Sequence, residues 1–577
     1  MENIGIARVL NEIADLLEIK GENPFRVRAY RSAAVTVADS GERVADLSRE
    51  ALLDLAGIGK DLAARIRDIV DTGTTSFRDE LLAEFPPTIL ELLRLQGVGP
   101  KTVATLYHEK RIGSVADLEA AAKAGALKGL KGFGPKKEQL ILKAIAERHV
   151  HAGRHLLAET LAVADELVRY LQARAPEATF DIVGSARRGC ETCGDIDLLA
   201  TRADPAVMDA FVAYPRVERV LGKGPTKSSV LLAKGYQADL RLVDAESRGA
   251  ALQYFTGSKA HNIALRDRAL SRGLTLNEYG LFRESDATRI AGETEEAIYG
   301  ALDLAMVPPE LRECRGEIEA AGSGRLPRLL TRADLRGDVH MHSTATDGRD
   351  DVATMAAAAR ARGLTYVAIT DHSQLLTMAN GLDEAGALAH AARVRALNGS
   401  LAGLTLLAGI ECDIRADGTL DLHDDCLAEL DLVIASVHSQ LSQDESAMTE
   451  RLLRAIENPY VDIIGHPTGR LLLRRESSRF DVDRVFAAAA AHGVALEING
   501  QADRMDLGDV LARHARDRGV KLVVSSDAHA QHALDLIEWS VLVARRAWLE
   551  PGDVLNTLPV GAFRAALRRH RAGRAPA

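Results

Sequence analysis

The 577-residue sequence has few cysteines and no long apolar run. Five cysteines are too few and too scattered for a disulfide framework in a chain of this length, so we expect reduced thiols and a cytoplasmic protein. No segment approaches the roughly 18 consecutive apolar residues of a membrane span. Residues 1–24 also lack the basic start and unbroken apolar stretch of a secretory signal. These absences argue against a secreted disulfide-rich domain and against a membrane protein.

The net charge of −10 at first argues against nucleic acid, but the charge is unevenly distributed. Residues 97–148 contain ten Lys and Arg against five Asp and Glu, a local excess of +5. Residues 335–577 contain 26 basic and 33 acidic residues, a local charge of −7. A basic front and an acidic back are typical of a DNA-binding region joined to a carboxylate-rich metal site.

The length favours several domains. Residues 1–150 show helices separated by Gly-rich turns, residues 151–243 a helix followed by short β-rich runs, and residues 244–316 a mixed pattern. Residues 317–334 have the Gly, Ser and Pro content of an interdomain linker. We therefore expect separate folded regions before and after this segment.

From residue 335 onward, seven apolar runs of strand length alternate with alanine-rich helical segments. The runs lie around Val339 and at 365–370, 404–410, 430–437, 461–464, 494–498 and 521–524. Such alternation predicts a parallel sheet closed into a (βα)7 barrel over residues 335–577. Chemistry in such barrels sits at the C-terminal strand ends.

Three Gly-x-Gly turns with a following lysine occur near the front, one within residues 1–80 and two within 81–150. They are formed by Gly57, Gly59 and Lys60; by Gly97, Gly99 and Lys101; and by Gly132, Gly134 and Lys136. Each turn opens a helix, where exposed N–H groups and the lysine favour a phosphate. One copy would fit a tight helix connection equally well, but three copies favour contacts to the DNA backbone. They resemble helix-hairpin-helix motifs, which hold DNA without reading its sequence.

The segment 184–197, Gly-Ser-Ala-Arg-Arg-Gly-Cys-Glu-Thr-Cys-Gly-Asp-Ile-Asp, is the most informative of the front half. Asp195 and Asp197 lie two residues apart on an expected strand and so share a face. Two such carboxylates repel each other unless a cation joins them, which predicts a pair of Mg²⁺ or Mn²⁺ ions. Asp239 on the next strand can supply a third carboxylate.

The same segment reproduces the nucleotidyltransferase signature, in which Ser185, Arg188 and the backbone of Gly189 would bind the β- and γ-phosphates of a nucleotide. The Cys-x-x-Cys pair within it has no second thiol pair to complete a zinc site.

Together with this signature, residues 254–262 (Tyr-Phe-Thr-Gly-Ser-Lys-Ala-His-Asn) resemble the family X, or DNA polymerase beta-like, DNA polymerases over residues 1–316. The resemblance implies a catalytic triad of Asp195, Asp197 and Asp239, an α+β palm at 151–243 and a nucleotide-selecting, thumb-type domain at 244–316. It places Tyr254, Phe255 and Gly257 against the sugar of a deoxynucleoside triphosphate, Asn262 at the base and Arg266 on the template. Residues 277–279 match a conformational-closure element of the family.

The first 80 residues resemble the small N-terminal domain of the same family, which implies a 5′-phosphate contact by Arg26, Tyr30 and Lys60. In DNA polymerase beta this domain removes a 5′-deoxyribose phosphate through a Schiff-base lysine. The matching position here is Arg65, whose guanidinium stays protonated and cannot form an imine. This substitution argues against beta-type lyase activity.

Histidines and carboxylates recur at the ends of the expected barrel strands, a pattern that resembles the PHP phosphoesterases. The resemblance implies three metal ions held by nine residues: His340, His342, Asp347, His372, Glu411, His438, His466, Asp527 and His529. Mixed imidazole and carboxylate ligation suits Zn²⁺, Mn²⁺ or Fe²⁺. Asp371 and Glu497 are candidates to orient histidines from behind, or to serve the fold alone.

The sequence thus predicts a monomeric, nucleoid-associated enzyme of base excision repair that fills gapped or nicked DNA. The barrel would act as a 3′–5′ exonuclease, with 3′-phosphatase or abasic-site endonuclease activity as further expectations. Two alternatives are a non-catalytic DNA-end scaffold, against which the complete aspartate triad speaks, and a PHP-type small-molecule phosphatase, which leaves residues 254–262 unexplained.

Overall fold

The computed structural model shows two compact units, residues Met1–Ala152 and Gly153–Ala577. It describes residues 3–39, 44–55, 57–86, 88–95, 98–127, 130, 133, 141–142, 145 and 153–567. Within these residues, none of the helices combines the length and the apolar character needed to cross a bilayer.

The N-terminal unit is helical. Its longest helix, α1 (Asn3–Lys20), contacts α2, α4, α5 and α6. Ile6, Leu10, Ile13 and Leu17 recur every three or four residues on α1 and are buried, as an amphipathic helix requires. The remaining elements are α2 (Pro24–Asp39), η1 (Val44–Asp46), α3 (Arg49–Leu52), α4 (Lys60–Thr72), α5 (Ser76–Ala83), η2 (Ile89–Arg94), α6 (Pro100–Lys110) and α7 (Val115–Lys123).

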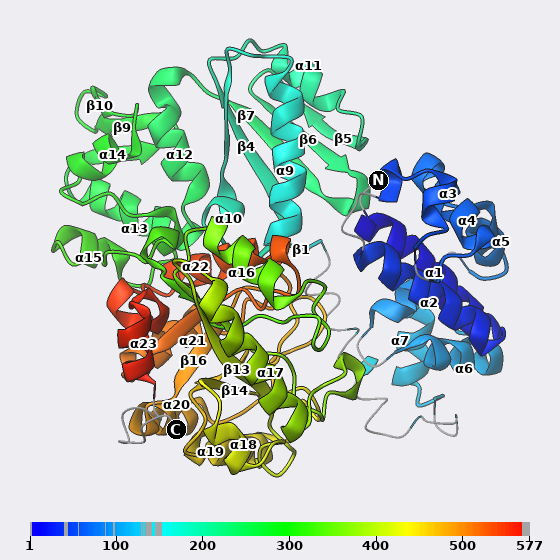
Figure 1. The fold of residues 1–577 in the computed structure, drawn as a ribbon. Coiled ribbons are helices and arrows are strands. Elements are labelled where there is room, and N and C mark those ends of the chain that lie inside the picture. Colours follow the sequence, from blue (N-terminus) through cyan, green and yellow to red (C-terminus); the bar gives the residue numbers. More distant parts are fainter. Residues whose placement is uncertain are drawn as a thin grey trace. The chain divides into compact units, whose positions relative to one another are not determined.

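The second unit begins with a five-stranded sheet (Figure 1). Its spatial order is β2 (Thr179–Ile182), β4 (Asp195–Thr201), β7 (Gln237–Leu242), β6 (Lys227–Leu232) and β5 (Val217–Lys223). Strands β4 and β7 are parallel, and the other neighbours are antiparallel. Helices α9 (Leu157–Gln172) and α11 (Val207–Val212) pack on the sheet through one apolar cluster. The parallel pair β4–β7 sets two expected catalytic aspartates side by side.

A smaller α+β region follows the sheet. A three-stranded antiparallel sheet of β8 (Leu274–Asn277), β9 (Gly280–Arg283) and β10 (Arg289–Ala291) shares an apolar core with its helices. The helices are α12 (Arg248–Thr256), α13 (Lys259–Leu270), α14 (Glu295–Ala301) and α15 (Glu317–Gly322).

The segment expected to be a linker is packed. It begins with α15, and Leu329 joins the core of the α12–α15 region while Leu330 joins the core of the C-terminal barrel. Both side chains are buried. Residues 317–334 thus connect two regions while contributing to both cores.

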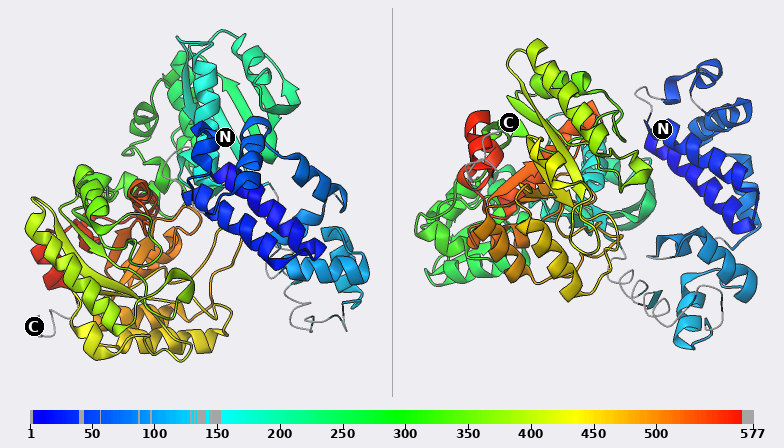
Figure 2. Two further views of the ribbon diagram at one scale, coloured as in Figure 1. Left: turned by 45° about the vertical axis from the view of Figure 1, so that its right-hand side comes forward. Right: turned by 60° about the horizontal axis from the view of Figure 1, so that its bottom comes forward.

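The C-terminal part is a barrel of seven parallel strands arranged in chain order (Figure 2). The strands are β11 (Gly337–Asp338), β12 (Tyr366–Ile369), β13 (Thr405–Asp413), β14 (Leu432–Ser436), β15 (Ile463–Ile464), β16 (Ala495–Asn499) and β17 (Leu522–Ser525). A parallel bridge between Met341 and Ala528 links the first and last strands just beyond their C-terminal ends. The expected (βα)7 fold is confirmed.

Helices lie between the strands and begin at clear caps. The side chains of Asp351, Asp383, Asp444 and Asp481 accept backbone N–H groups at the starts of four helices. The helices are α16 (Val352–Ala361), α17 (Glu384–Leu397), α18 (Asp424–Ala428), α19 (Glu445–Glu457), α20 (Val482–His492), α21 (Asp509–Asp517), α22 (Ile537–Arg546) and α23 (Val560–Ala566).

Candidate active sites

The first expected hairpin has the geometry of a phosphate-binding turn. Gly57 has a φ of +76°, Gly59 caps α4, and Lys60 begins that helix on the surface. The second hairpin caps α6 with Gly99 and exposes Lys101. Both turns leave helix N–H groups available for an anion. The other predicted hairpin residues, namely Gly97, Gly132, Gly134 and Lys136, lie outside the described residues.

Two of the three expected 5′-phosphate contacts, Arg26 and Tyr30, lie against Phe77. The guanidinium of Arg26 lies 4.9 Å from the ring centroid and that of Arg65 lies 4.1 Å from it. Tyr30 stacks on the same ring and is only 3% exposed. Tyr30 is therefore buried against Phe77, and the exposed Arg26 packs over the same ring. Arg65 also pairs with Asp61 at 3.0 Å, so it contributes to packing at the position of the family's lysine.

The polymerase aspartates meet where β4 pairs with β7. Asp197 lies opposite Asp239, and Asp195 lies opposite Gln237. Gly184 leaves room for this arrangement, because a Cβ there would lie 2.4 Å from Oδ2 of Asp197. The structure thus brings the three predicted carboxylates together on two adjacent inner strands of the sheet.

The charges of this cluster are poorly compensated by the protein. Burial, then Asp195 and Asp239, raise the pKa of Asp197 to about 7. Burial and Asp239 likewise raise the pKa of Asp195. Lys227 forms an ion pair with Oδ2 of Asp239 at 3.0 Å. Divalent cations would relieve this repulsion, and carboxylate oxygens are the ligands that Mg²⁺ and Mn²⁺ prefer.

The turn next to these aspartates, residues 184–191, carries the twin arginines in different roles. Arg187 forms a bidentate pair with the buried Glu295 and donates to the hydroxyl of Thr256. It therefore stabilises the packing of the turn against α12 and α14. Arg188 binds the carbonyl of Thr256 at 2.8 Å and Glu313 at 3.0 Å. Ser185 lies in the short helix α10 (Gly184–Arg187), and Gly189 has a φ of +68°.

The expected nucleotide-contacting residues occupy the junction of α12 and α13. Gly257 is required there, because a Cβ would lie 2.6 Å from the side-chain oxygen of Asn262. Asn262 donates to the carbonyl of Tyr254 at 2.6 Å and accepts from Gln253 at 2.8 Å, which fixes its amide. Phe255 lies under the guanidinium of Arg241, 4.5 Å from it.

Phe255 lines a pocket of about 400 Å³ together with Arg241, Glu278 and Tyr279. Glu278 and Tyr279 belong to the closure element expected from the sequence. Arg266 is exposed on α13, so its side chain is accessible to a bound ligand.

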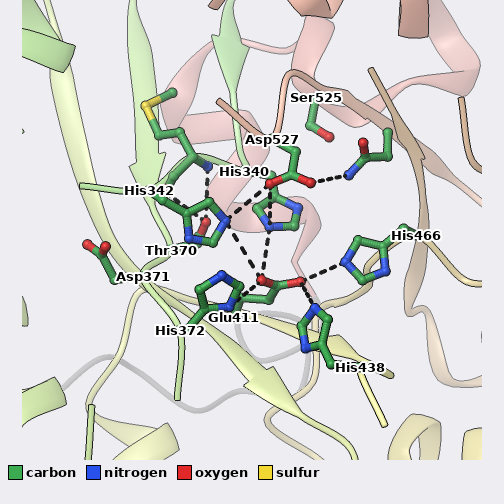
Figure 3. Close-up of polar contacts among 12 residues, drawn as sticks. His340, His342, Thr370, Asp371, His372, Glu411, His438, His466, Ser525 and Asp527 are labelled. Carbon is green, nitrogen blue, oxygen red and sulfur yellow. Dashed lines mark hydrogen bonds and ion pairs between the residues drawn. The ribbon is translucent and has the colours of Figure 1, made fainter. Parts of the chain in front are cut away.

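The nine residues expected to bind metal converge at the C-terminal ends of the barrel strands. Figure 3 shows all of them except Asp347 and His529. Glu411 lies at the centre: its carboxylate oxygens are 2.9 Å from Nδ1 of His372, 2.9 Å from Nε2 of His466 and 3.3 Å from Nε2 of His438. Asp527 lies 3.2 Å from Nε2 of His342. Three groups have ligand atoms close enough to hold an ion: His342, Asp347, His372 and His529; His340, His342 and Asp527; and His372, Glu411 and His438.

The side-chain chemistry of this centre fits metal ions. Nε2 of His340, both ring nitrogens of His342 and Nδ1 of His466 are buried and make no hydrogen bond. Carboxylate oxygens lie 3.2–3.8 Å from these nitrogens of His340 and His342. Leaving buried groups without hydrogen bonds is costly unless a cation binds them. His466 and Asp527 also have positive φ angles, a strain that folded proteins keep mainly at functional positions.

The electrostatics point the same way. Burial lowers the pKa of His372, but Glu411 and Asp347 outweigh it and raise that pKa to about 10. Glu411 and Asp413 similarly raise the pKa of His438 to about 9 against the effect of burial. Burial, then His529 and His372, lower the pKa of His342 to about 4. In the metal-free cluster protons provide the positive charge that metal ions would supply.

Glu497 contacts two of the nine residues, His340 and His466, and orients them, which was one of the two interpretations of the sequence. Its carboxylate binds Nδ1 of His340 at 2.6 Å, the backbone N–H of His466 at 2.6 Å and the hydroxyl of Ser525. Such partners fix the ring orientation of a ligating histidine.

Asp371 fits the other of the two sequence interpretations, a role in the fold, and Figure 3 shows it apart from the polar network around Glu411. It accepts hydrogen bonds from Ser343 and Thr346 and pairs with His390 at 2.8 Å. Asp371 therefore fixes the turn that leads to Asp347 instead of orienting one of the nine residues.

Sequence reasoning missed two further partners. Asp413 lies 3.2 Å from Nδ1 of His438, and Asn499 donates to Asp527 at 3.0 Å. Each lies two residues after a residue already singled out, Glu411 or Glu497. The period-two alternation of a strand was the signal that could have found them.

Comparisons with known proteins match the helical unit, the polymerase regions and the barrel. Family models match a helix-hairpin-helix domain (1–75), a SAM-like helix-hairpin-helix tandem (89–147), a DNA polymerase beta palm (157–221), a DNA polymerase beta thumb (251–313) and a PHP domain (338–501). Over 573 residues, 99% of this chain and 100% of the relative, the sequence is 37% identical to the DNA polymerase/3′-5′ exonuclease PolX of Bacillus subtilis (strain 168). The chain belongs to the family X DNA polymerases that carry a PHP domain. The resemblance stated from the sequence is confirmed.

Other relatives of this family X polymerase match the barrel alone. A probable phosphatase of Thermoanaerobacter sp. (strain X514) is 31% identical over 242 residues, 40% of this chain and 91% of the relative. A probable phosphatase of Shewanella sediminis (strain HAW-EB3) is 32% identical over 232 residues, 38% of this chain and 89% of the relative. The barrel is thus similar to proteins that consist almost entirely of the matched region.

Proposed function

We propose that the chain is a DNA-directed DNA polymerase that fills short gaps during base excision repair, and that its barrel removes nucleotides from 3′ ends. The observation that carries the polymerase proposal is the pairing of Asp197 with Asp239 beside Asp195, next to a turn with an arginine for phosphates. Helix-hairpin-helix turns provide contacts to gapped or nicked DNA that are independent of sequence.

In the polymerase centre, Asp195, Asp197 and Asp239 would hold Mg²⁺ or Mn²⁺. Such ions supply charge neutralisation at the α-phosphate and at the leaving pyrophosphate. Ser185, Arg188 and the backbone of Gly189 bind the β- and γ-phosphates. Asp239, once separated from Lys227, accepts the proton of the primer 3′-hydroxyl as this oxygen bonds to the α-phosphorus and the bond from that phosphorus to the oxygen of the pyrophosphate breaks.

The residues at the α12–α13 junction select the nucleotide. Tyr254, Phe255 and Gly257 lie against the sugar, and the fixed amide of Asn262 faces the base. Arg266 contacts the template strand. Arg26, Lys60 and Lys101 bind DNA phosphates on the N-terminal unit.

In the barrel, the nine residues that converge on its rim would hold Zn²⁺, Mn²⁺ or Fe²⁺, ions that lower the pKa of a bound water and stabilise charge on a phosphate. In hydrolysis of the terminal diester, a water would add its oxygen to the phosphorus while the bond to the penultimate 3′-oxygen breaks and that oxygen takes up a proton. A nucleoside monophosphate leaves. Glu497 and Asp413 keep their histidines in the orientation that this chemistry needs.

One experiment tests both centres. The purified chain is incubated with a 5′-labelled primer on a gapped duplex, with either deoxynucleotides and Mg²⁺ or Mn²⁺, or Mn²⁺ alone. Asp197→Ala should abolish extension and keep shortening, whereas His342→Ala should do the reverse. Absence of extension by the wild type with either metal would refute the polymerase proposal.

A second activity of the barrel is favoured by its similarity to probable phosphatases. We propose that the same centre removes a 3′-phosphate, and that it cuts at abasic sites. Primers ending in a 3′-phosphate or containing an abasic site test this, and loss of both reactions in His342→Ala would assign them to the barrel.

A further inference from the structure

The barrel makes direct polar contacts with the 184–191 turn of the polymerase centre. Arg470, four residues after His466, forms a bidentate pair with Glu191 at 2.5 and 3.1 Å. The same guanidinium donates to the backbone carbonyls of Arg504 and Met505, so the barrel itself holds it in place. One arginine thus joins the loop that carries His466 to the turn that carries Arg188.

A second arginine reaches the turn from α22. Arg546 donates to the backbone carbonyl of Arg188 at 2.6 Å and pairs with Glu313 at 3.2 Å. Glu313 is also the partner of the Arg188 side chain. Asp509, at the start of α21, holds the other end of the Arg546 guanidinium at 2.9 Å. Arg546 is 6% exposed, so water screens these contacts little.

Apolar packing fits the turn to the barrel as well. A Cβ at Gly189 would lie 2.6 Å from the side chain of Leu542 on α22, so the backbone of the turn rests on this helix. Ala186 and Cys193, on either side of residues 188–191, belong to the apolar cluster of the barrel. At Gly508 a Cβ would lie 2.8 Å from Arg470 and 2.9 Å from Glu191, so the missing side chain leaves space for their ion pair.

We propose that Arg470 and Arg546 of the PHP barrel are positioning residues of the polymerase centre, which hold residues 188–191 in the conformation that binds the triphosphate of the incoming nucleotide. This inference rests on the proposed role of Arg188 and Gly189. Neither arginine is among the nine residues expected to bind metal, so the barrel serves the polymerase centre through side chains separate from its own chemistry. Bidentate arginine pairs fix geometry as well as charge, which suits such a role.

Nucleotide binding without turnover tests the proposal. Complexes of the full chain with a gapped duplex and a dideoxy-terminated primer are titrated with the next deoxynucleotide and Mg²⁺. Arg546→Gln should weaken nucleotide binding about tenfold, the change expected for losing one hydrogen bond that involves a charged group. Arg470→Lys should weaken nucleotide binding less than Arg470→Gln, because lysine keeps the positive charge although it lacks the two parallel N–H donors of the guanidinium.

Four readouts separate positioning from general damage. Inorganic triphosphate should lose affinity in parallel with the nucleotide, because the turn binds phosphates and not the base. The dissociation constant for DNA and the 3′–5′ exonuclease rate should stay at the wild-type value, which also shows that the barrel is folded. In steady-state extension the change should fall on KM and not on kcat, as for a contact equally strong in the ground and transition states.

Arg545→Gln is the matched control. Arg545 precedes Arg546 on α22 and also bridges to the preceding region, pairing with Glu310 at 2.8 Å, but it makes no contact to the turn. It should bind nucleotide like the wild type. Should Arg546→Gln be insoluble, Glu191→Gln is the alternative variant. It removes the negative charge of the Arg470–Glu191 pair by a change in the palm, and it should also weaken nucleotide binding.

Unchanged nucleotide affinity in Arg546→Gln and Glu191→Gln, or an equal loss in Arg545→Gln, would overturn the proposal. A wild type that binds nucleotide but does not extend the primer would refute the polymerase activity and leave the positioning role measurable. A wild type that binds no nucleotide would refute both.

Discussion

At the scale of single residues, both centres concentrate charges that the protein alone compensates poorly. Asp197 illustrates the cost. The pKa of Asp197 in the folded chain, about 7, lies above the value of about 4 for an unfolded aspartate. The penalty for ionising it in the fold is therefore absent below about pH 4, grows between pH 4 and 7, and is complete above pH 7.

Asp197→Asn should consequently stabilise the metal-free chain. We expect a gain in the free energy of unfolding of roughly 2–4 kcal/mol at pH 8 and a smaller gain at pH 5. Thermal or urea unfolding in a chelating buffer at the two pH values measures it. Asp165→Asn on the exposed face of α9 is the control, and an equal gain at both pH values would contradict the explanation.

The carboxylate behind the barrel histidines should control metal affinity. Glu497→Gln keeps the size of the side chain but weakens its contacts to His340 and to the backbone of His466. Loss of such a partner typically lowers metal affinity by about 10- to 100-fold. Competition with a chromophoric chelator measures the change, and the exposed Glu538→Gln should bind metal like the wild type. Unchanged affinity in Glu497→Gln would show that its role is confined to the fold.

At the scale of elements, the sequence predicted those helices and strands that have a clear pattern of hydrophobic residues. Six barrel strands, β12 to β17, were found because each is largely buried and rich in apolar residues. The first strand, β11, has only Gly337 and Asp338 and lies next to the run expected around Val339. The edge strand β5 was missed because six of its seven residues are exposed and its side chains do not alternate. The pair of β1 (His155–Leu156) and β3 (Thr192–Cys193) is too short to leave a pattern.

Prediction of the site residues failed where a role depends on tertiary contacts. The twin arginines Arg187 and Arg188 look alike in sequence, and only the positions of Glu295 and Glu313 distinguish them. His390 could not be connected with Asp371, because the two are 19 residues apart and only the packing of α17 brings them together. The Gly- and Pro-containing segment 317–334 gave no sign that its leucines are buried.

The helix-hairpin-helix turns should act through phosphate charge. Lys60→Ala and Lys101→Ala should each weaken binding of gapped DNA for any sequence and reduce the slope of log Kd against log salt concentration by about one. Fluorescence anisotropy over a salt series measures this slope. Lys123→Ala, on α7 and paired with Glu119, should leave the slope unchanged; an equal decrease there would point to the general charge of the unit.

At the scale of the whole molecule, the palm and the barrel share a core. Leu157, Ala186 and Cys193 of the palm belong to the same apolar cluster as the barrel strands and α22. The chain from Gly153 onward is accordingly one compact unit. An apolar interface of this kind couples the folding of the parts it joins.

Removal of residues 335–577 should therefore destabilise the palm, because it exposes these side chains and leaves Glu191 without Arg470. We expect the fragment 1–334 to aggregate or to lose cooperative unfolding in calorimetry. The fragment 153–577, which keeps its complete core, should unfold in one transition. A soluble 1–334 fragment with a sharp transition would contradict the shared core.

The contacts between the barrel and the 184–191 turn have an evolutionary consequence. Arg470, Leu542 and Arg546 perform no hydrolysis, so mutations that inactivate the exonuclease leave them intact. A lineage that lost its barrel catalysis would still be under selection to retain the barrel as a support for DNA synthesis. Loss of the metal-binding residues would therefore remove only the exonuclease, whereas deletion of the whole domain would also impair DNA synthesis.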